Sequence, residues 1–207
     1  MKIARSWIAL ILLLTTLPAG AGTALVLGDS LSAAYNLPAE DGWVALLERR
    51  LAPEHRIVNA SVSGETTRGG LARLDRLLAD HQPDVLVVEL GANDGLRGLP
   101  LSNMESALAE IVQRGQQAGA RVLILGMRLP PNYGSAYADR FHQVYRRVAE
   151  KTGAELIPFF LAEIATRWDL MQPDGVHPTA EAQPALADRV EPALRSLLEP
   201  DTRETAE

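Results

Sequence analysis

The chain contains no cysteine among its 207 residues. This absence excludes structural disulfides, and it also excludes a lipid-modified N-terminal cysteine. A protein without such cross-links must be stabilised by its hydrophobic core, and a chain of this length suits one globular domain. Its 47% hydrophobic and 22% charged residues are ordinary for a soluble fold and far from the composition of a disordered one.

Concentrated positive charge is also missing. The formal net charge is −6, and it becomes −8 if Lys2 and Arg5 are removed with an N-terminal leader. Binding to a nucleic-acid backbone needs a basic stripe or patch, and the sequence shows none. Nucleic acid is therefore not an expected partner.

One long apolar run occurs, at the N-terminus. Lys2 and Arg5 precede it, and Ala19-Gly20-Ala21 forms an A-x-A cleavage site, so residues 1–21 are predicted to be a secretory signal peptide. The alternative is an uncleaved membrane anchor, which needs about 20 apolar residues. Because Pro18 and two threonines interrupt this run, we expect cleavage, no stable membrane insertion afterwards, and a periplasmic or secreted location.

Several common functional motifs are absent as well. The sequence has no G-x-S-x-G elbow, no G-x-G-x-x-G pattern and no Walker A motif, which disfavours ordinary α/β-hydrolase, dinucleotide and P-loop functions. Its four histidines lack metal-ligand spacing, so we expect no metal and no cofactor. His55, His81 and His142 share no loop with both a serine and a carboxylate, and we interpret them as solvated or core residues.

What the sequence does contain is a repeated alternation of apolar runs and amphipathic stretches between residues 22 and 199. Strands are predicted at 24–28, 56–60, 85–90, 121–125 and 155–158, and helices at 43–51, 67–79, 102–118, 137–152 and 180–198. The strands are rich in Val, Ile and Leu, as buried parallel strands are. The alternation predicts an α/β domain with a parallel sheet covered by helices on both sides. The polar tail at 200–207 is expected to fray.

Polar residues gather where these strands end. Ser30 follows the first strand in "GDSL", Gly64 follows the second in "SVSGETT", and Asn93 follows the third in "GANDG". Asp174 and His177 lie in "QPDGVHPT" before the last helix. Because ligands of parallel sheets bind beyond the carboxyl ends of the strands, these loops are expected to share one rim.

This combination predicts a serine hydrolase. A serine hydroxyl needs a base within hydrogen-bonding reach, histidine is a suitable base, and a carboxylate fixes its tautomer. Asp174 and His177 are close enough in sequence for one turn to join them. Backbone N–H groups of Ser30 and Gly64, with the Asn93 amide, can converge on an oxyanion. Gly28 would leave the approach to Ser30 unobstructed.

Each segment also has a purely structural interpretation. Gly-Asp-Ser after a strand is a common turn and helix cap, with Asp29 either stabilising that turn or polarising the site. Gly64 can be a loop glycine with positive φ, and Asn93-Asp94-Gly95 is a good turn sequence. Trp43 and Trp168 are interpreted as packing residues and not as ligand platforms.

Taken together, "GDSL" at 28–31, Gly64, "GAND" at 91–94 and "DGVHP" at 174–178 resemble the blocks of the SGNH/GDSL hydrolase superfamily. The stretch "GMRLPPNYG" at 126–134 resembles its thioesterase I, lysophospholipase L1 and arylesterase branch. The resemblance implies a flavodoxin-like, three-layer α/β/α sandwich with a five-stranded parallel sheet. It also implies a catalytic triad of Ser30, Asp174 and His177, and oxyanion donors from Ser30, Gly64 and Asn93.

The resemblance further implies a serine esterase and thioesterase, which the predicted signal peptide would export, and we expect it to be a monomer. Its expected substrates are small-molecule acyl esters or thioesters, with lysophospholipids among them. Two alternatives stay open at this point. One is a carbohydrate O-acetyl esterase of the same superfamily, and the other is a non-catalytic lipid- or glycan-binding module on the same scaffold.

Overall fold

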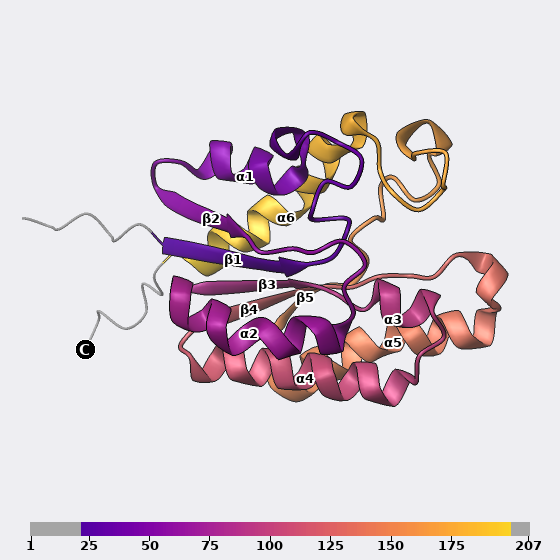
Figure 1. Cartoon of the computed structure of the whole chain (residues 1–207), viewed down its shortest axis with the longest axis horizontal. Helices are drawn as coiled ribbons and strands as arrows, with labels where there is room; N and C mark the ends of the chain where they lie inside the picture. The colour runs from indigo at the N-terminus through magenta and orange to yellow at the C-terminus, as the bar shows by residue number, and fades with distance from the viewer. Residues whose placement is uncertain (1–21, 200–207) are drawn as a thin grey trace, which may run out of the picture.

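A parallel sheet of five strands forms the centre of the protein (Figure 1). The computed structural model describes residues 22–199, so the expected signal peptide (1–21) and tail (200–207) lie outside the described residues. The strand order is β2-β1-β3-β4-β5, and every neighbouring pair is parallel. The strands are β1 Gly22–Gly28, β2 His55–Asn59, β3 Val85–Glu89, β4 Arg121–Leu125 and β5 Glu155–Ile157.

Helices cover both faces of this sheet. Two of them, α1 (Trp43–Leu51) and α6 (Gln183–Leu198), pack together on one face. The opposite face carries α2 (Thr67–His81), α4 (Leu101–Gln117) and α5 (Ser135–Thr152). The three-layer α/β/α sandwich predicted from the sequence is therefore confirmed.

The apolar pattern of the sequence explains these layers. Every residue of β3 is buried, as expected for a strand with helices on both faces. In α4, Met104, Leu108 and Ile111 are buried on one face while Glu110 is exposed, which is the predicted amphipathic arrangement. Gly153 follows the last residue of α5, and its φ of 71° is the left-handed conformation of a C-terminal glycine cap.

Two expectations about local structure are wrong. Residues 92–96 form a short helix, α3 (Ala92–Leu96), and not a turn, because Gly91 at φ 113° starts a helical turn closed by the Gly95 N–H on the Gly91 carbonyl. Trp168 is 80% exposed and is not a packing residue. It lies in a short 3₁₀ helix of the long β5–α6 connection, at the surface. Trp43, by contrast, is fully buried against Phe160, as expected.

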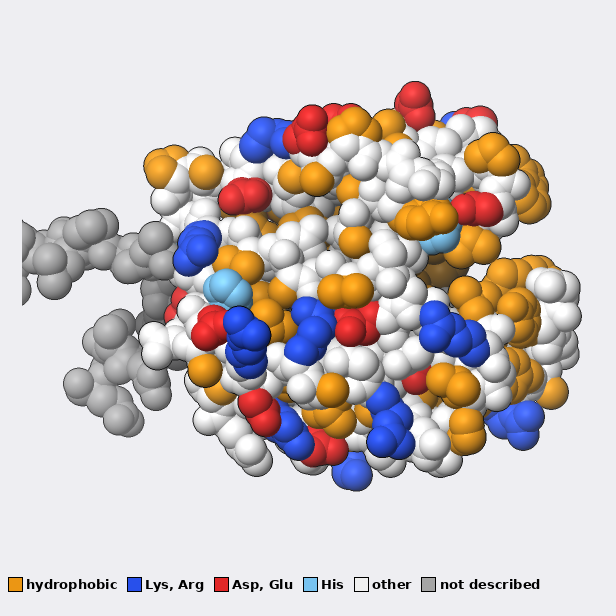
Figure 2. Space-filling view, viewed as in Figure 1, with side chains coloured by type: hydrophobic (Ala, Val, Ile, Leu, Met, Phe, Trp, Pro, Cys, Tyr) orange, Lys and Arg blue, Asp and Glu red, His pale blue; other side chains and the backbone are white. Residues whose placement is uncertain are grey.

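The strand order also determines where a ligand can bind. Strand β1 lies between β2 and β3, so the chain leaves β1 toward one edge of the sheet and returns past it to form β3. The loops after β1 and β3 therefore separate at a topological switch point, which is where open α/β sheets bind ligands. Figure 2 shows a hollow with a hydrophobic rim at the end of the molecule toward which β1 points in Figure 1. Between residues 22 and 199, no helix is long and apolar enough to span a membrane.

Candidate active site

Ser30, His177 and Asp174 form one continuous hydrogen-bonded chain. The Ser30 Oγ lies 2.8 Å from His177 Nε2, although 147 positions separate the two residues. His177 Nδ1 lies 2.7 Å from Asp174 Oδ2. Since a carboxylate can only accept, Nδ1 carries the hydrogen and Nε2 presents its lone pair to the serine hydroxyl. This is the tautomer that a general base needs.

The local backbone holds Asp174 in its ionised form. Asp174 Oδ1 accepts the N–H groups of Val176 at 2.9 Å and His177 at 3.0 Å. Burial of the carboxyl acts to raise its pKa, but these bonds and the bond from the imidazole outweigh burial and lower the pKa of Asp174 to about 2. Asp174 is therefore a carboxylate at neutral pH.

Ser30 lies just beyond the end of β1, in a tight turn closed by backbone hydrogen bonds. The Ala33 N–H donates to the Asp29 carbonyl at 3.0 Å, and the Tyr35 N–H donates to the Ser30 carbonyl at 3.2 Å. A Cβ on Gly28 would lie only 2.7 Å from the Ser32 Oγ, so this glycine permits the turn to fold back on its own strand. The Tyr35 ring lies 4.3 Å from the His177 ring between centroids, which limits movement of the imidazole.

A cavity of about 220 Å³ opens beside the serine. Ser30, His177, Gly64 and Asn93 all line it, so the four loops named by the sequence do share one rim. Gly64 has a φ of +78°, so its interpretation as a loop glycine in the left-handed region also holds. The remaining lining is largely apolar and consists of Leu31, Tyr35, Ala92, Leu96 and Val176, together with Asp29 and Ser63.

Two charged side chains fix the orientation of the Asn93 amide. Asn93 Nδ2 donates to Asp29 Oδ2 at 2.9 Å, and Arg97 donates to Asn93 Oδ1 at 3.4 Å. In the flipped orientation the amide oxygen would face the carboxylate, acceptor against acceptor, and the NH₂ would face the guanidinium, donor against donor. Both hydrogen bonds would be lost, so the orientation described is the one that the two side chains favour. Arg97 also donates to the Gly64 carbonyl at 2.7 Å, so it links the two loops that are expected to supply oxyanion donors. Sequence reasoning missed Arg97.

A second group that sequence reasoning missed lies directly beneath this loop. Glu89, the last residue of β3, is fully buried, and its Oε2 accepts the Ser32 hydroxyl at 2.7 Å and the Asp29 N–H at 3.2 Å. Burial and the nearby Asp29 carboxyl raise the pKa of Glu89 well above its usual value. A lone glutamate at the end of an otherwise apolar strand, immediately before "GAND", was the signal available in the sequence.

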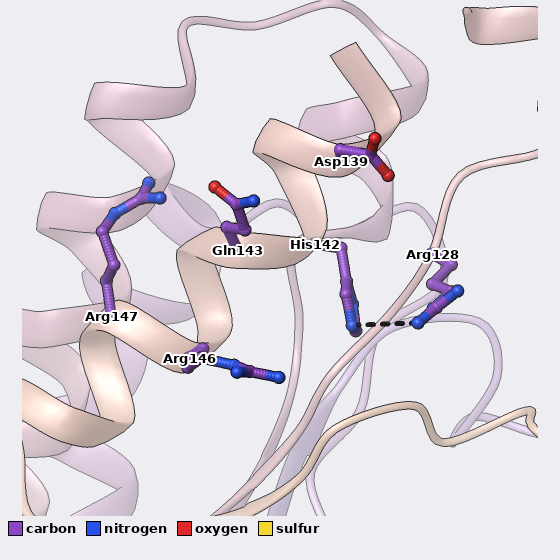
Figure 3. A pocket seen from close by; sticks show the side chains of 6 residues that line it. All are labelled: Arg128, Asp139, His142, Gln143, Arg146 and Arg147. Carbon is purple, nitrogen blue, oxygen red and sulfur yellow. Dashed lines mark hydrogen bonds between the residues drawn. The ribbon is translucent and has the colours of Figure 1, made fainter. Parts of the chain in front are cut away.

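A larger hollow, of about 380 Å³, lies at α5 and does not include the triad. Figure 3 shows it lined by Arg128, Asp139, His142, Gln143, Arg146 and Arg147. The His142 Nδ1 lies 3.0 Å from the Met127 carbonyl, and its Nε2 faces Arg128 at 3.5 Å. Within residues 22–199, His142 thus hydrogen-bonds to neither a serine nor a carboxylate, which agrees with its exclusion as a catalytic base.

Comparison with known proteins shows which family the chain belongs to. Residues 26–184 match the model of the GDSL-like Lipase/Acylhydrolase family. The chain is 50% identical to Esterase TesA of Pseudomonas aeruginosa, over 91% of this chain and 96% of the relative. It is 43% identical to Thioesterase 1/protease 1/lysophospholipase L1 of Escherichia coli K12, over 93% of this chain and 92% of the relative.

The fold matches as well. A crystal structure of TesA superimposes with a TM-score of 0.83, covering 85% of this chain and 99% of that one. The family match covers residues 26–184, which include the loops that carry Ser30, Asn93 and His177. The chain therefore belongs to the GDSL-like lipase and acylhydrolase family, in the branch of TesA and thioesterase 1, and is an enzyme that hydrolyses ester bonds.

Proposed function

We propose that the protein is an exported, monomeric serine esterase and thioesterase that cleaves acyl chains from small-molecule esters and thioesters. Ser30 is the nucleophile, His177 the general base, and Asp174 the carboxylate that orients His177. The Ser30 and Gly64 N–H groups and the Asn93 amide form the oxyanion hole. The observation that carries this proposal is the unbroken chain from Asp174 through His177 to Ser30, at 2.7 and 2.8 Å, at the edge of a cavity lined by Gly64 and Asn93.

Acylation follows from this geometry. Ser30 Oγ attacks the acyl carbonyl carbon while His177 Nε2 takes its proton. The carbonyl oxygen becomes an oxyanion, which the amide donors bind more strongly than the neutral carbonyl. His177 then gives the proton to the leaving alcohol or thiol, and the C–O or C–S bond breaks to leave an acyl ester on Ser30.

Deacylation repeats these steps with water. His177 takes a proton from the water as its oxygen attacks the acyl-serine ester. The second tetrahedral intermediate collapses, and the proton returns from His177 to Ser30 Oγ. The acid leaves and the enzyme is regenerated, so the cycle consumes one water molecule and needs no cofactor.

The cavity wall favours an acyl chain over a sugar. Leu31, Ala92, Leu96 and Val176 give the site apolar surface close to Ser30. Burial of methylene groups on such a wall stabilises a bound chain by about 0.8 kcal/mol per CH₂. A glycan carrying a single acetyl group would place hydroxyl groups there without matching hydrogen-bond partners. We therefore propose that acyl esters and thioesters are better substrates than carbohydrate O-acetyl esters.

The first prediction concerns substrate preference. The purified protein should hydrolyse p-nitrophenyl esters and acyl-CoA thioesters, and kcat/KM should rise as the acyl chain lengthens from C2 until the cavity is filled. The measurement is a panel of p-nitrophenyl esters from C2 to C16, acyl-CoAs, lysophospholipids and acetylated xylan, with Ser30→Ala as the blank. Preference for C2 and acetylated xylan would support the carbohydrate esterase instead. No turnover on any substrate would leave only a binding module.

The second prediction concerns export. Lys2, Arg5 and Ala19-Gly20-Ala21 have the arrangement of a signal peptide, so periplasmic or secreted material should have an intact mass that begins near Gly22. A matched control replaces Ala19 and Ala21 by bulky residues, which should block cleavage and leave the longer chain. Full-length protein confined to the cytoplasm would contradict export.

A further inference from the structure

Two carboxyl groups lie side by side beneath the nucleophile, and the catalytic steps described above use neither of them. Asp29 is 1% exposed and Glu89 is fully buried. The Asp29 N–H donates to Glu89 Oε2 at 3.2 Å, and Gly28, the residue before Asp29, pairs with Glu89 across β1 and β3, so the two buried residues are neighbours. Two adjacent buried carboxylates would repel each other, so the pair holds a proton.

The hydrogen bonds around the pair show where that proton belongs. Asp29 accepts from two donors, with Oδ1 taking the Leu31 N–H at 3.1 Å and Oδ2 taking the Asn93 amide at 2.9 Å. Both bonds require an acceptor. On Glu89 only Oε2 accepts, and Oε1 has no hydrogen-bond partner among the residues that the structure describes. A proton on Glu89 satisfies this second oxygen by making it a donor.

The other titratable groups around the pair are consistent with a proton on Glu89. Tyr145 of α5 lies near both carboxyl groups and near Asp94 of α3, and His177 acts on Asp29 from the loop before α6. Only His177 among these can carry positive charge, and it acts on Asp29. Burial raises the pKa of Asp29, but only to about 6, because the bonds from Leu31, Asn93 and Glu89 oppose the effect of burial. Glu89 also has two donors, the Ser32 hydroxyl and the Asp29 N–H, but both bind its Oε2, and no donor reaches its Oε1 among the described residues.

We propose that Glu89 is a protonated carboxylic acid that donates to Asp29, and that the Asp29 carboxylate is a positioning residue that holds the Asn93 amide toward the oxyanion. The position of the proton matters because a protonated Asp29 would present a donor to Asn93. The amide would then lose its acceptor, and its second N–H would no longer be directed at the cavity. This inference rests on the proposed function, which makes Asn93 an oxyanion donor.

A double-mutant cycle tests the route through Asn93. Asp29→Asn keeps the size of the side chain but offers one oxygen for all three bonds, so kcat should fall about 10- to 100-fold with little change in KM. If Asp29 acts through Asn93, the same change in an Asn93→Ala background should lower kcat by less than about threefold. Equal losses in both backgrounds, or no loss in the wild type, would overturn the proposal. A failure of the proposed function would be seen in a different experiment, because Ser30→Ala would then still turn over substrate.

The pH dependence of stability tests the proton itself. A Glu89 pKa raised above 4.5 means that the folded state binds more protons than the unfolded state, so the free energy of unfolding falls as pH rises above 4.5. Glu89→Gln removes this dependence, so its melting temperature should rise relative to wild type between pH 4.5 and pH 8. The control is Glu150→Gln, the same change at an exposed position of α5, which should show no such trend. A difference between Glu89→Gln and wild type that is constant with pH would show that Glu89 is ionised and would overturn the proposal.

Discussion

Replacing Ser30 by alanine is expected to lower kcat by a factor on the order of 10⁶, the scale on which a serine triad depends on its nucleophile. The physical reason is that alanine removes the atom that forms the covalent intermediate, and His177 then has no proton to take. Ser30 is half-buried in a surface turn, so the fold should be retained. The measurement is steady-state kinetics on a p-nitrophenyl ester, beside a melting curve for each variant.

The companion variant His177→Ala should lose a similar factor, and the double variant should lose hardly more than either one. Residues that act as one unit in catalysis are strongly non-additive in this way. His142→Ala is the matched control, because His142 contacts the Met127 carbonyl and Arg128 in a separate hollow. Comparable inactivation by His142→Ala without unfolding would show that the base has been assigned wrongly.

Replacing Asn93 by alanine is expected to lower kcat by about 10²–10³-fold, equivalent to about 2.7–4 kcal/mol, with little change in KM. The amide is directed by Asp29 and Arg97, so it meets the transition state already oriented. Its charge-stabilising effect is therefore larger for the oxyanion than for the neutral carbonyl of the substrate. Kinetics across several substrate concentrations separates the change in kcat from the change in KM.

The competing interpretation is that Asn93 only shapes the short helix α3. In that case Asn93→Ala should lower the melting temperature while kcat per folded molecule stays close to wild type. Asn103→Ala is a suitable control, because Asn103 is an exposed position in the first turn of α4. A wild-type kcat in a destabilised Asn93→Ala variant would remove Asn93 from the site.

Much of the fold and of the site geometry could be predicted from the sequence, for one physical reason. Parallel strands all end at one edge of a sheet, so residues that follow strand ends meet even when they are far apart in the chain. This rule places Ser30 near Asn93 from the apolar runs alone. Joining Asp174 to His177 required only their spacing of three residues in a loop bounded by glycine and proline.

The remaining features depend on contacts that no local pattern records. Glu89 ends a strand whose other residues are apolar, and its burial beneath Asp29 follows only from the packing of β1 against β3. In the sequence Arg97 looks like an ordinary surface residue, and only the folded structure shows that it donates to the Gly64 carbonyl. Trp168 was expected to be packed because tryptophan usually is, but a long surface connection leaves it exposed.

The most direct test of the central claim is covalent labelling of the nucleophile. A fluorophosphonate probe should add one adduct per molecule of wild-type protein, and peptide mapping by mass spectrometry should place it on Ser30. His177→Ala should label far more slowly, since the hydroxyl then lacks its base. Ser30→Ala should not label at all. An adduct on another serine, or undiminished labelling of Ser30→Ala, would contradict the account.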